Sequence, residues 1–242
     1  KRQTERSVAF VWSTIIGLLV ASRVIPNPLH LVYAFLITFF VGTAVYVYNE
    51  VTDYKFDKIN RVNRPIATDS VTRKEGLLVA LVLLSLGILL STLINLETLL
   101  LSATFFLLGF LYSTPPIRLK NRFLMKQIIT AIGGFITCLI GGTIVGNISL
   151  QVIYLGFIFF LLIIANSPIA DIADLRGDMV GRVKSITVVY GPKFAIKFAI
   201  VVEVLMMILT ALVYPYVGFN ILTPITLTLG LLIFIWLAYT LR

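Results

Sequence analysis

The sequence predicts an all-α protein, a polytopic bundle of transmembrane helices. Three observations predict this fold class. The mean hydropathy of the 242 residues is +1.00, far above that of an ordinary soluble domain. Apolar runs recur along the whole chain, and the charged residues gather in the segments that follow every second run. We treat residues 1–242 as a single transmembrane domain.

Eight apolar runs are long enough, or nearly so, to cross about 30 Å of hydrocarbon as helices that rise about 1.5 Å per residue. In chain order they lie at residues 8–25, 30–48, 76–94, 97–113, 127–145, 152–170, 194–214 and 221–241. Apolar and polar residues do not alternate within them, so they are not strands of a membrane barrel. Helices are required because lipid offers no partner for backbone groups.

The loops between the runs are of two kinds. Four short loops, PNPLH, INLE, VGNISLQ and YPYVGFN, contain no lysine or arginine, whereas the longer segments 49–75, 114–126 and 171–193 are rich in both. Arg23 is the one basic residue that falls on the side of the short loops. The positive-inside rule predicts an integral protein of the cell membrane whose long loops and both ends face the cytoplasm. The net charge of +9 therefore reflects topology, and no nucleic-acid partner is expected.

The fifth run, at 127–145, contains two pairs of glycines eight residues apart. They are Gly133 with Gly134, and Gly141 with Gly142. Small residues on one helix face allow a second helix to approach closely, so this run is predicted to pack tightly against a neighbour.

An acidic cluster follows the second run, in the segment NEVTDYKFDKINRVNRP (49–65). Asn49, Asp53 and Asp57 are spaced four residues apart, so on a helix that continues past the run they share one face. A second cluster, DIADLRGD, follows the sixth run, where Asp171, Asp174 and Asp178 are also expected to share one helix face. Two like charges at this spacing destabilise a helix unless something neutralises them.

The two clusters have two interpretations. They are either solvated faces whose acids pair with nearby lysines and arginines, or a metal site. Carboxylate and amide oxygens suit Mg²⁺ or Mn²⁺. His30 lies at the opposite end and Cys138 lies inside an apolar run, so a zinc site is excluded. Two facing clusters would hold two or more such ions and, between them, a diphosphate.

Basic residues lie near both clusters or on the same membrane face. They are Arg61, Arg64, Arg118, Lys120 and Lys184. Guanidinium and ammonium groups suit a diphosphate, although each of these residues is equally well explained by topology alone.

The segments that carry these residues resemble three motifs of the UbiA-type intramembrane prenyltransferases. Segment 49–66 is similar to the first, N-x-x-x-D-x-x-x-D, although Glu50 stands where the family usually has aspartate. DIADLRGDMVGRVKS is similar to the second aspartate motif, through Asp174 and Asp178. LYSTPPIRLKNR resembles the tyrosine-then-basic motif after the fourth span. The family has nine helices, whereas eight runs are counted here.

The resemblance implies a function. Such enzymes transfer an isoprenyl group from an allylic prenyl diphosphate to a lipophilic acceptor, usually aromatic, within the membrane and with Mg²⁺. The active site then lies at the cytoplasmic end of the bundle. In this chain the metal ligands would be Asn49, Asp53 and Asp57 for one ion, and Asp174 and Asp178 with Asp171 for another. Arg61, Arg64, Arg118 and Lys184 would bind the diphosphate, while Tyr112 and Lys120 would border the reactive carbon or the leaving group.

Two other classes were weighed. CDP-alcohol phosphotransferases also combine intramembrane acids with Mg²⁺, but their D-x-x-D-G-x-x-A-R signature is missing here. A cation-coupled transporter would place acids or broken helices near the bilayer midplane, whereas these clusters lie at its edge. Candidate acceptors are a quinone-ring precursor, a chlorophyll-like macrocycle, a haem or a glyceryl phosphate.

Overall fold

The computed structural model describes residues 2–59, 63–181 and 183–240, and every regular element in these ranges is a helix. The long helices are α1 (Arg2–Ser22), α2 (Pro28–Ile59), α3 (Arg73–Thr92), α4 (Leu96–Ser113), α5 (Met125–Ile144), α6 (Leu150–Ile172), α9 (Pro192–Val217) and α10 (Leu222–Thr240). Three short helices complete the set: η1 (Leu119–Asn121), α7 (Leu175–Val180) and α8 (Ile186–Tyr190). The predicted all-α class is confirmed.

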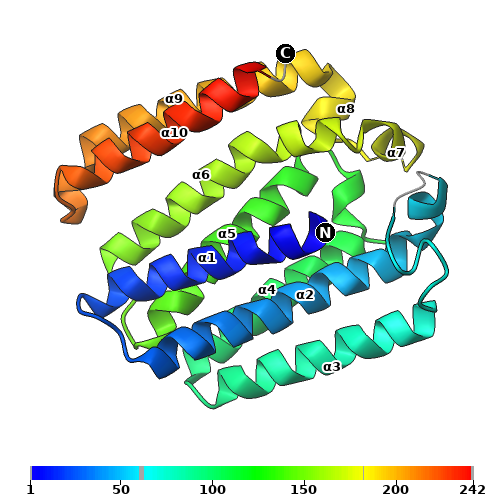
Figure 1. Cartoon of the computed structure of the whole chain (residues 1–242), viewed down its shortest axis with the longest axis horizontal. Coiled ribbons are helices and arrows are strands. Elements are labelled where there is room, and N and C mark those ends of the chain that lie inside the picture. The colour runs from blue at the N-terminus through cyan, green and yellow to red at the C-terminus, as the bar shows by residue number, and fades with distance from the viewer. Residues whose placement is uncertain (1, 60–62, 182, 241–242) are drawn as a thin grey trace.

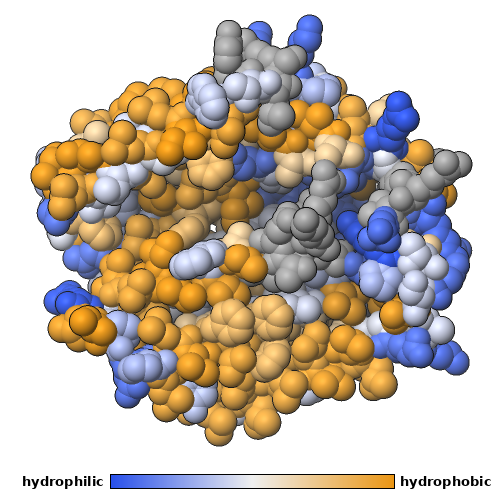
Figure 2. Space-filling model, viewed as in Figure 1, coloured by the Kyte–Doolittle hydropathy of each residue, from blue (hydrophilic) through white to orange (hydrophobic). Residues whose placement is uncertain are grey.

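Each long helix coincides with one predicted run. Six of them, α2 to α6 and α9, are long and apolar enough to cross a membrane, while the apolar parts of α1 and α10 are shorter, at Val8–Ser22 and Leu222–Leu237. Many apolar side chains of α3, α9 and α10 are exposed, and Figure 2 shows hydrophobic residues over much of the visible face. Such a surface requires lipid around it, because soluble proteins rarely expose large contiguous apolar patches.

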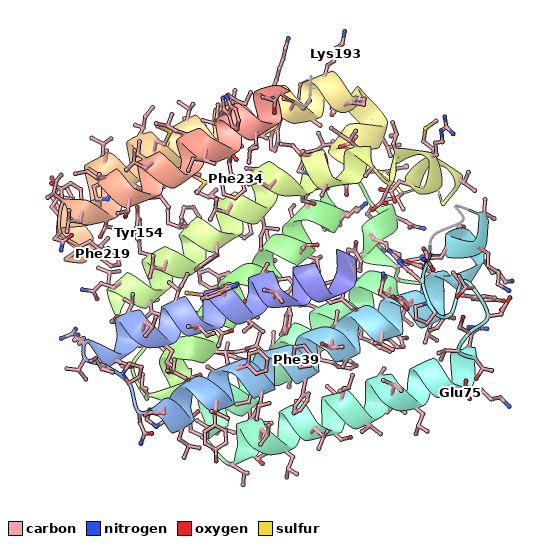
Figure 3. All side chains as sticks on the ribbon, in the orientation of Figure 1. Phe39, Glu75, Tyr154, Lys193, Phe219 and Phe234 are labelled. Carbon is pink, nitrogen blue, oxygen red and sulfur yellow. The ribbon has the colours of Figure 1, made fainter. Side chains whose placement is uncertain are left out.

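Caps and loops fix where the helices begin. Thr72 and Glu75 form a capping box at the start of α3, in which each side chain accepts a backbone N–H of the other residue. Asn95 caps α4 and also donates to the carbonyl of Thr143 at 2.6 Å, which ties α4 to the end of α5. At the same end of the bundle Tyr154 of α6 contacts Phe219, which follows α9 (Figure 3).

The interior combines apolar packing with hydroxyl pairs between helices. Phe10, Ile37, Phe105 and Ile140 belong to the main cluster of buried side chains, formed by α1, α2, α4 and α5. Around it Ser13 pairs with Thr137, and Thr14 with Thr38, at 2.6 and 2.8 Å. Lipid offers no hydrogen-bond partner for a hydroxyl group, so each pair satisfies the two hydroxyls that it joins.

Helix α5 occupies the middle of the bundle, and α1 packs on it most closely. A Cβ atom on Gly141 would lie 2.0 Å from the carbonyl oxygen of Thr14, and one on Gly17 would lie 2.1 Å from that of Cys138. Backbone atoms cannot be displaced as a flexible side chain can, so both positions require glycine. The predicted close approach at the fifth run is confirmed, and its partner is α1.

Two features of the long helices create the site. Helix α2 has 32 residues and a length of about 48 Å, so it extends well beyond the hydrocarbon. Helix α6 ends at Ile172, and the chain then turns into α7 and α8. Figure 1 shows α7, α8 and the end of α2 at one end of the bundle, opposite the loop between α1 and α2.

The contact between α1 and α5 can be tested with one methyl group. Gly141→Ala should lower the melting temperature in detergent, because the helices must separate and overpacking costs about 1–3 kcal/mol. Gly230→Ala in α10 is the matched control, since a Cβ there meets no atom within 4 Å. We expect Gly230→Ala to leave the melting temperature unchanged or to raise it. Equal losses in the two variants would contradict the tight seam.

Candidate active site

The first acidic cluster lies on one helix face, as the spacing predicted. Asn49, Asp53 and Asp57 all belong to α2, beyond its apolar part. All three side chains line one cavity of about 730 Å³ at this end of the bundle. The continuation of the second span as a helix is therefore confirmed.

The second cluster does not lie on one helix, and this expectation was wrong. Helix α6 ends at Ile172, and the backbone N–H of Asp174 bonds to the carbonyl of Asp171 at 3.1 Å in a tight turn before α7. The turn separates the three acids. Asp174 and Asp178 line the cavity, whereas Asp171 is buried and is not among its lining residues. Asp171 is placed as a buried partner of other side chains rather than as a group open to the cavity.

The cavity joins residues from four parts of the chain. Acidic side chains come from α2 and from the turn and helix after α6, while the basic ones come from the loop after α2, the segment between α4 and α5, the first turn of α5, and α7. Four acidic residues line it, Asp53, Asp57, Asp174 and Asp178, together with five basic ones, Arg64, Arg118, Lys120, Lys126 and Arg176. Tyr112 of α4 also lines it. Such a cavity carries a small excess of positive charge and can accept anions.

Ion pairs hold the first cluster to the loop after α4. Asp53 accepts from Arg118 at 2.6 Å and also from Lys120. Asn49 Oδ1 accepts from Lys120 at 2.9 Å and from Ser113 at 2.7 Å. Arg118 has φ of +34° in the left-handed region, which is uncommon for a residue other than glycine, and its guanidinium lies 4.7 Å from the Phe56 ring. The loop is thus wound so that both cations reach α2.

Asp57 has its own cation. Arg64, in the chain just beyond α2, donates to Asp57 at 2.7 Å, with the two side chains 20% and 10% exposed. Arg61, the other predicted diphosphate ligand in this segment, lies outside the described residues. Lys184 is exposed and is not among the residues that line the cavity, so the structure does not bring it to the other site residues. Its contact with diphosphate stays a prediction.

The sequence interpretation missed two basic residues that line the cavity, Lys126 and Arg176. Lys126 lies in the first turn of α5 and forms ion pairs with Asp171 at 2.8 Å and with Asp178. Gln127 donates to the second oxygen of Asp171 at 3.0 Å. The only signal in the sequence was a lysine at the start of the fifth run, which the positive-inside rule explains equally well. Lys126 forms ion pairs with acids of the second cluster, as Lys120 does with Asp53 of the first.

Burial shifts the pKa of a lysine and of an aspartate at this site in opposite directions, in each case toward the neutral form. It lowers the pKa of Lys120 to about 8, an effect that the nearby Asp53 opposes. It raises the pKa of Asp178, and there Lys126 opposes it. In each case the ion-pair partner, Asp53 for Lys120 and Lys126 for Asp178, favours the charged form against burial. The Lys120 ammonium also lies 5.5 Å from the centre of the Tyr112 ring.

The donor set fits magnesium in one particular way. Among the described residues, no three acids, histidines or cysteines converge closely enough to cage an ion by themselves. Mg²⁺ rarely needs such a cage, because it usually takes one or two carboxylates and completes its shell with water and phosphate oxygens. Asp53, Asp57, Asp174 and Asp178 supply carboxylates on the same cavity. These carboxylates fit a Mg²⁺ ion whose other ligands are water and the oxygens of a bound phosphate.

The bundle and its cavity define an integral membrane protein with a polar, anion-accepting site at one end of its helices. Comparison with known protein families shows which family the chain belongs to. The family model for the UbiA prenyltransferase family matches residues 10–242, and the chain belongs to this family of prenyl-transferring enzymes. The sequence resemblance is confirmed.

Relatives and solved structures agree with this assignment. Digeranylgeranylglyceryl phosphate synthase of Methanosphaera stadtmanae is 31% identical over 191 residues, which are 79% of this chain and 69% of the relative. The structure of a UbiA homologue from Archaeoglobus fulgidus bound to DMAPP and Mg²⁺ has a TM-score of 0.82 and 21% identity, over 98% of this chain and 84% of that one. A digeranylgeranylglyceryl phosphate synthase structure has a TM-score of 0.67 and 25% identity, over 100% and 88%.

Lys126 and Asp171 offer a direct test of the second cluster. Their side chains are 15% and 4% exposed. Lys126→Met should lower the free energy of unfolding by about 3 kcal/mol, because it leaves a buried carboxylate without its cation. Combined with Asp171→Asn, it should cost clearly less than the sum of the two single losses. Both would be measured by titrating the folded protein with denaturing detergent.

The control for this cycle is the pair Lys58–Asp69, whose side chains are 41% and 75% exposed. Lys58→Met should cost less than about 1 kcal/mol, as exposed ion pairs do. Additive losses for Lys126 and Asp171, or equal losses at Lys58 and Lys126, would show that the buried pair does not hold the cluster.

Proposed function

We propose that this protein transfers a prenyl group from a prenyl diphosphate to the hydroxyl of a lipid-linked glyceryl phosphate, in a reaction that requires Mg²⁺. The observation that carries the proposal is the cavity in which basic residues slightly outnumber acids at one end of an apolar bundle. Membership of the UbiA prenyltransferase family supplies the reaction class and sets aside the phosphotransferase and transporter alternatives.

The nature of the acceptor is inferred from the relatives. Several relatives similar to this chain are digeranylgeranylglyceryl phosphate synthases, whose name describes a glyceryl phosphate that carries two geranylgeranyl groups. The sequence resemblance favoured an aromatic acceptor, and the relatives do not support that preference.

The roles of the site residues follow from their contacts. Asn49, Asp53 and Asp57 on one side, and Asp174 and Asp178 on the other, would hold Mg²⁺ through hard oxygen atoms. Bound magnesium supplies Lewis-acid neutralisation of the diphosphate. Arg64, Arg118, Lys120 and Lys126 already point into the cavity as partners of the acids. On substrate binding they would turn part of their hydrogen bonding from carboxylate to phosphate oxygens.

The proposed prenyl transfer needs no protein nucleophile. The allylic C–O bond breaks and its electron pair leaves with the diphosphate, whose charge the basic side chains stabilise. The acceptor hydroxyl oxygen forms the new C–O bond, and its proton passes to the released diphosphate. Tyr112 and Lys120 line the cavity on the α4 side and would border the leaving group. The helices exclude water from the reacting carbon.

The proposed acceptor can be tested with purified protein in lipid nanodiscs. We expect geranylgeranyl diphosphate and geranylgeranylglyceryl phosphate to give a doubly prenylated product, detected by mass spectrometry, only when Mg²⁺ is present. Removal of the metal with EDTA should stop turnover, and readdition should restore it. A p-hydroxybenzoate acceptor should give no product. Prenylation of the aromatic acid instead of the glyceryl phosphate would contradict the proposed acceptor while leaving the reaction class intact.

The requirement for both acidic clusters can be tested separately. Asp53→Ala and Asp174→Ala should each lower the turnover number by more than about a hundredfold. Each removes a carboxylate that would hold the Mg²⁺ on which charge stabilisation of the leaving group depends. Asp69→Ala is the matched control: Asp69 pairs with Lys58 on the surface and does not line the cavity. All three variants should elute as folded protein. Near-normal turnover in either site variant would show that the two-cluster site is wrong.

A further inference from the structure

A second cavity lies at the end of the bundle opposite the active site. It has a volume of about 520 Å³ and is formed by the end of α1, the loop into α2 and the loop between α5 and α6. Figure 1 shows this end of α1 far from α7 and α8. Asn147 of the second loop donates to the carbonyl of Ala21 at 2.7 Å, so the two walls are joined directly. The proposed prenyl transfer gives this cavity no role.

An arginine and a histidine line this cavity, Arg23 and His30. Arg23 has φ of +54°, a left-handed conformation that is uncommon outside glycine, and it directly follows the last residue of α1. Neither side chain forms an ion pair or hydrogen bond with any residue in the described ranges, and no acid lines the cavity. Arg23 is also the one basic residue that the topology places away from the others. Arg23 is exposed and His30 is half-buried, so an anion that enters the cavity can reach both side chains.

The surroundings of the cavity are apolar and face outward. Val24 and Ile25, which also line it, are 74% and 95% exposed. Figure 2 shows hydrophilic and hydrophobic residues side by side at the end of the molecule where the α1–α2 loop lies. Exposed aliphatic side chains at the edge of a membrane bundle are stable when they contact lipid rather than water. A ligand that reaches Arg23 beside them would be amphipathic.

We propose that this cavity binds the phosphate of an anionic phospholipid from the leaflet opposite the active site. The Arg23 guanidinium would form charge-assisted hydrogen bonds with the phosphate, and His30 would donate one more. Val24 and Ile25 would contact the glycerol backbone and the first part of the acyl chains. Arg23 would otherwise extend into water beside the headgroups, as long basic side chains do at membrane edges. These two arrangements make different predictions for lipid retention.

Native mass spectrometry of protein released from nanodiscs provides the test. Nanodiscs of equal phosphatidylglycerol and phosphatidylcholine would be used. Wild-type protein should retain one phosphatidylglycerol in preference to phosphatidylcholine, and the double variant Arg23→Gln/His30→Gln should retain roughly tenfold less. Lys193→Ala is the control, because Lys193 is exposed and lies at the other end of the bundle (Figure 3). It should retain the lipid as wild type does.

Further measurements separate the possible sources and guard against misfolding. Arg23→Lys keeps the charge and should retain more lipid than Arg23→Gln. Prenyl transfer in the double variant should be unchanged, which shows that it is folded. Inorganic phosphate at millimolar concentration should not displace the lipid, and its full displacement would overturn a lipid source. Equal retention in wild type and double variant, or no preference between the two lipids, would overturn the proposal.

Discussion

The site depends on one electrostatic constraint: acids on facing elements must be neutralised before they can share a cavity. Asp53, Asp57 and Asp178 each have a basic partner, and two of these partners, Lys120 and Lys126, come from the short stretch that runs from η1 into the first turn of α5. That segment therefore acts as a wedge of positive charge between two acidic elements. Without it, like charges at the ends of α2 and α6 would repel each other and the cavity would open.

The membrane explains why this chemistry gathers at one end. Within hydrocarbon every backbone group must be satisfied by its own helix, so loops and turns can form only outside it. Helix α2 leaves the apolar layer as an intact helix and carries its acids outward, while α6 stops and turns at Ala173. The two clusters differ in shape for this reason. One is a row on a single helix face, and the other is a turn followed by a short helix.

The sequence predicted the eight long helices because lipid imposes a strong and simple pattern on apolar runs. It also predicted that Asn49, Asp53 and Asp57 share a face, since that depends only on helical spacing. It did not predict the burial of Asp171 or its pairing with Lys126, because both follow from the turn after α6 and from the way α5 packs beside it. Lys184 was selected by its place after the second motif, yet the fold leaves it exposed. The spacing of residues along one helix can be predicted from the sequence, whereas the ion-pair partner of a charged residue depends on tertiary contacts.

The glycine seam between α1 and α5 has a consequence for how the protein is made. Helix α1 packs most extensively against α5, and three long helices, α2, α3 and α4, are synthesised between the two. Until α5 is present, Gly17 lacks the Cys138 backbone against which it packs and the Ser13 hydroxyl lacks Thr137, whereas Thr14 finds its partner Thr38 on α2. Helix α1 must therefore remain in the bilayer with an incomplete interface until α5 is inserted beside it.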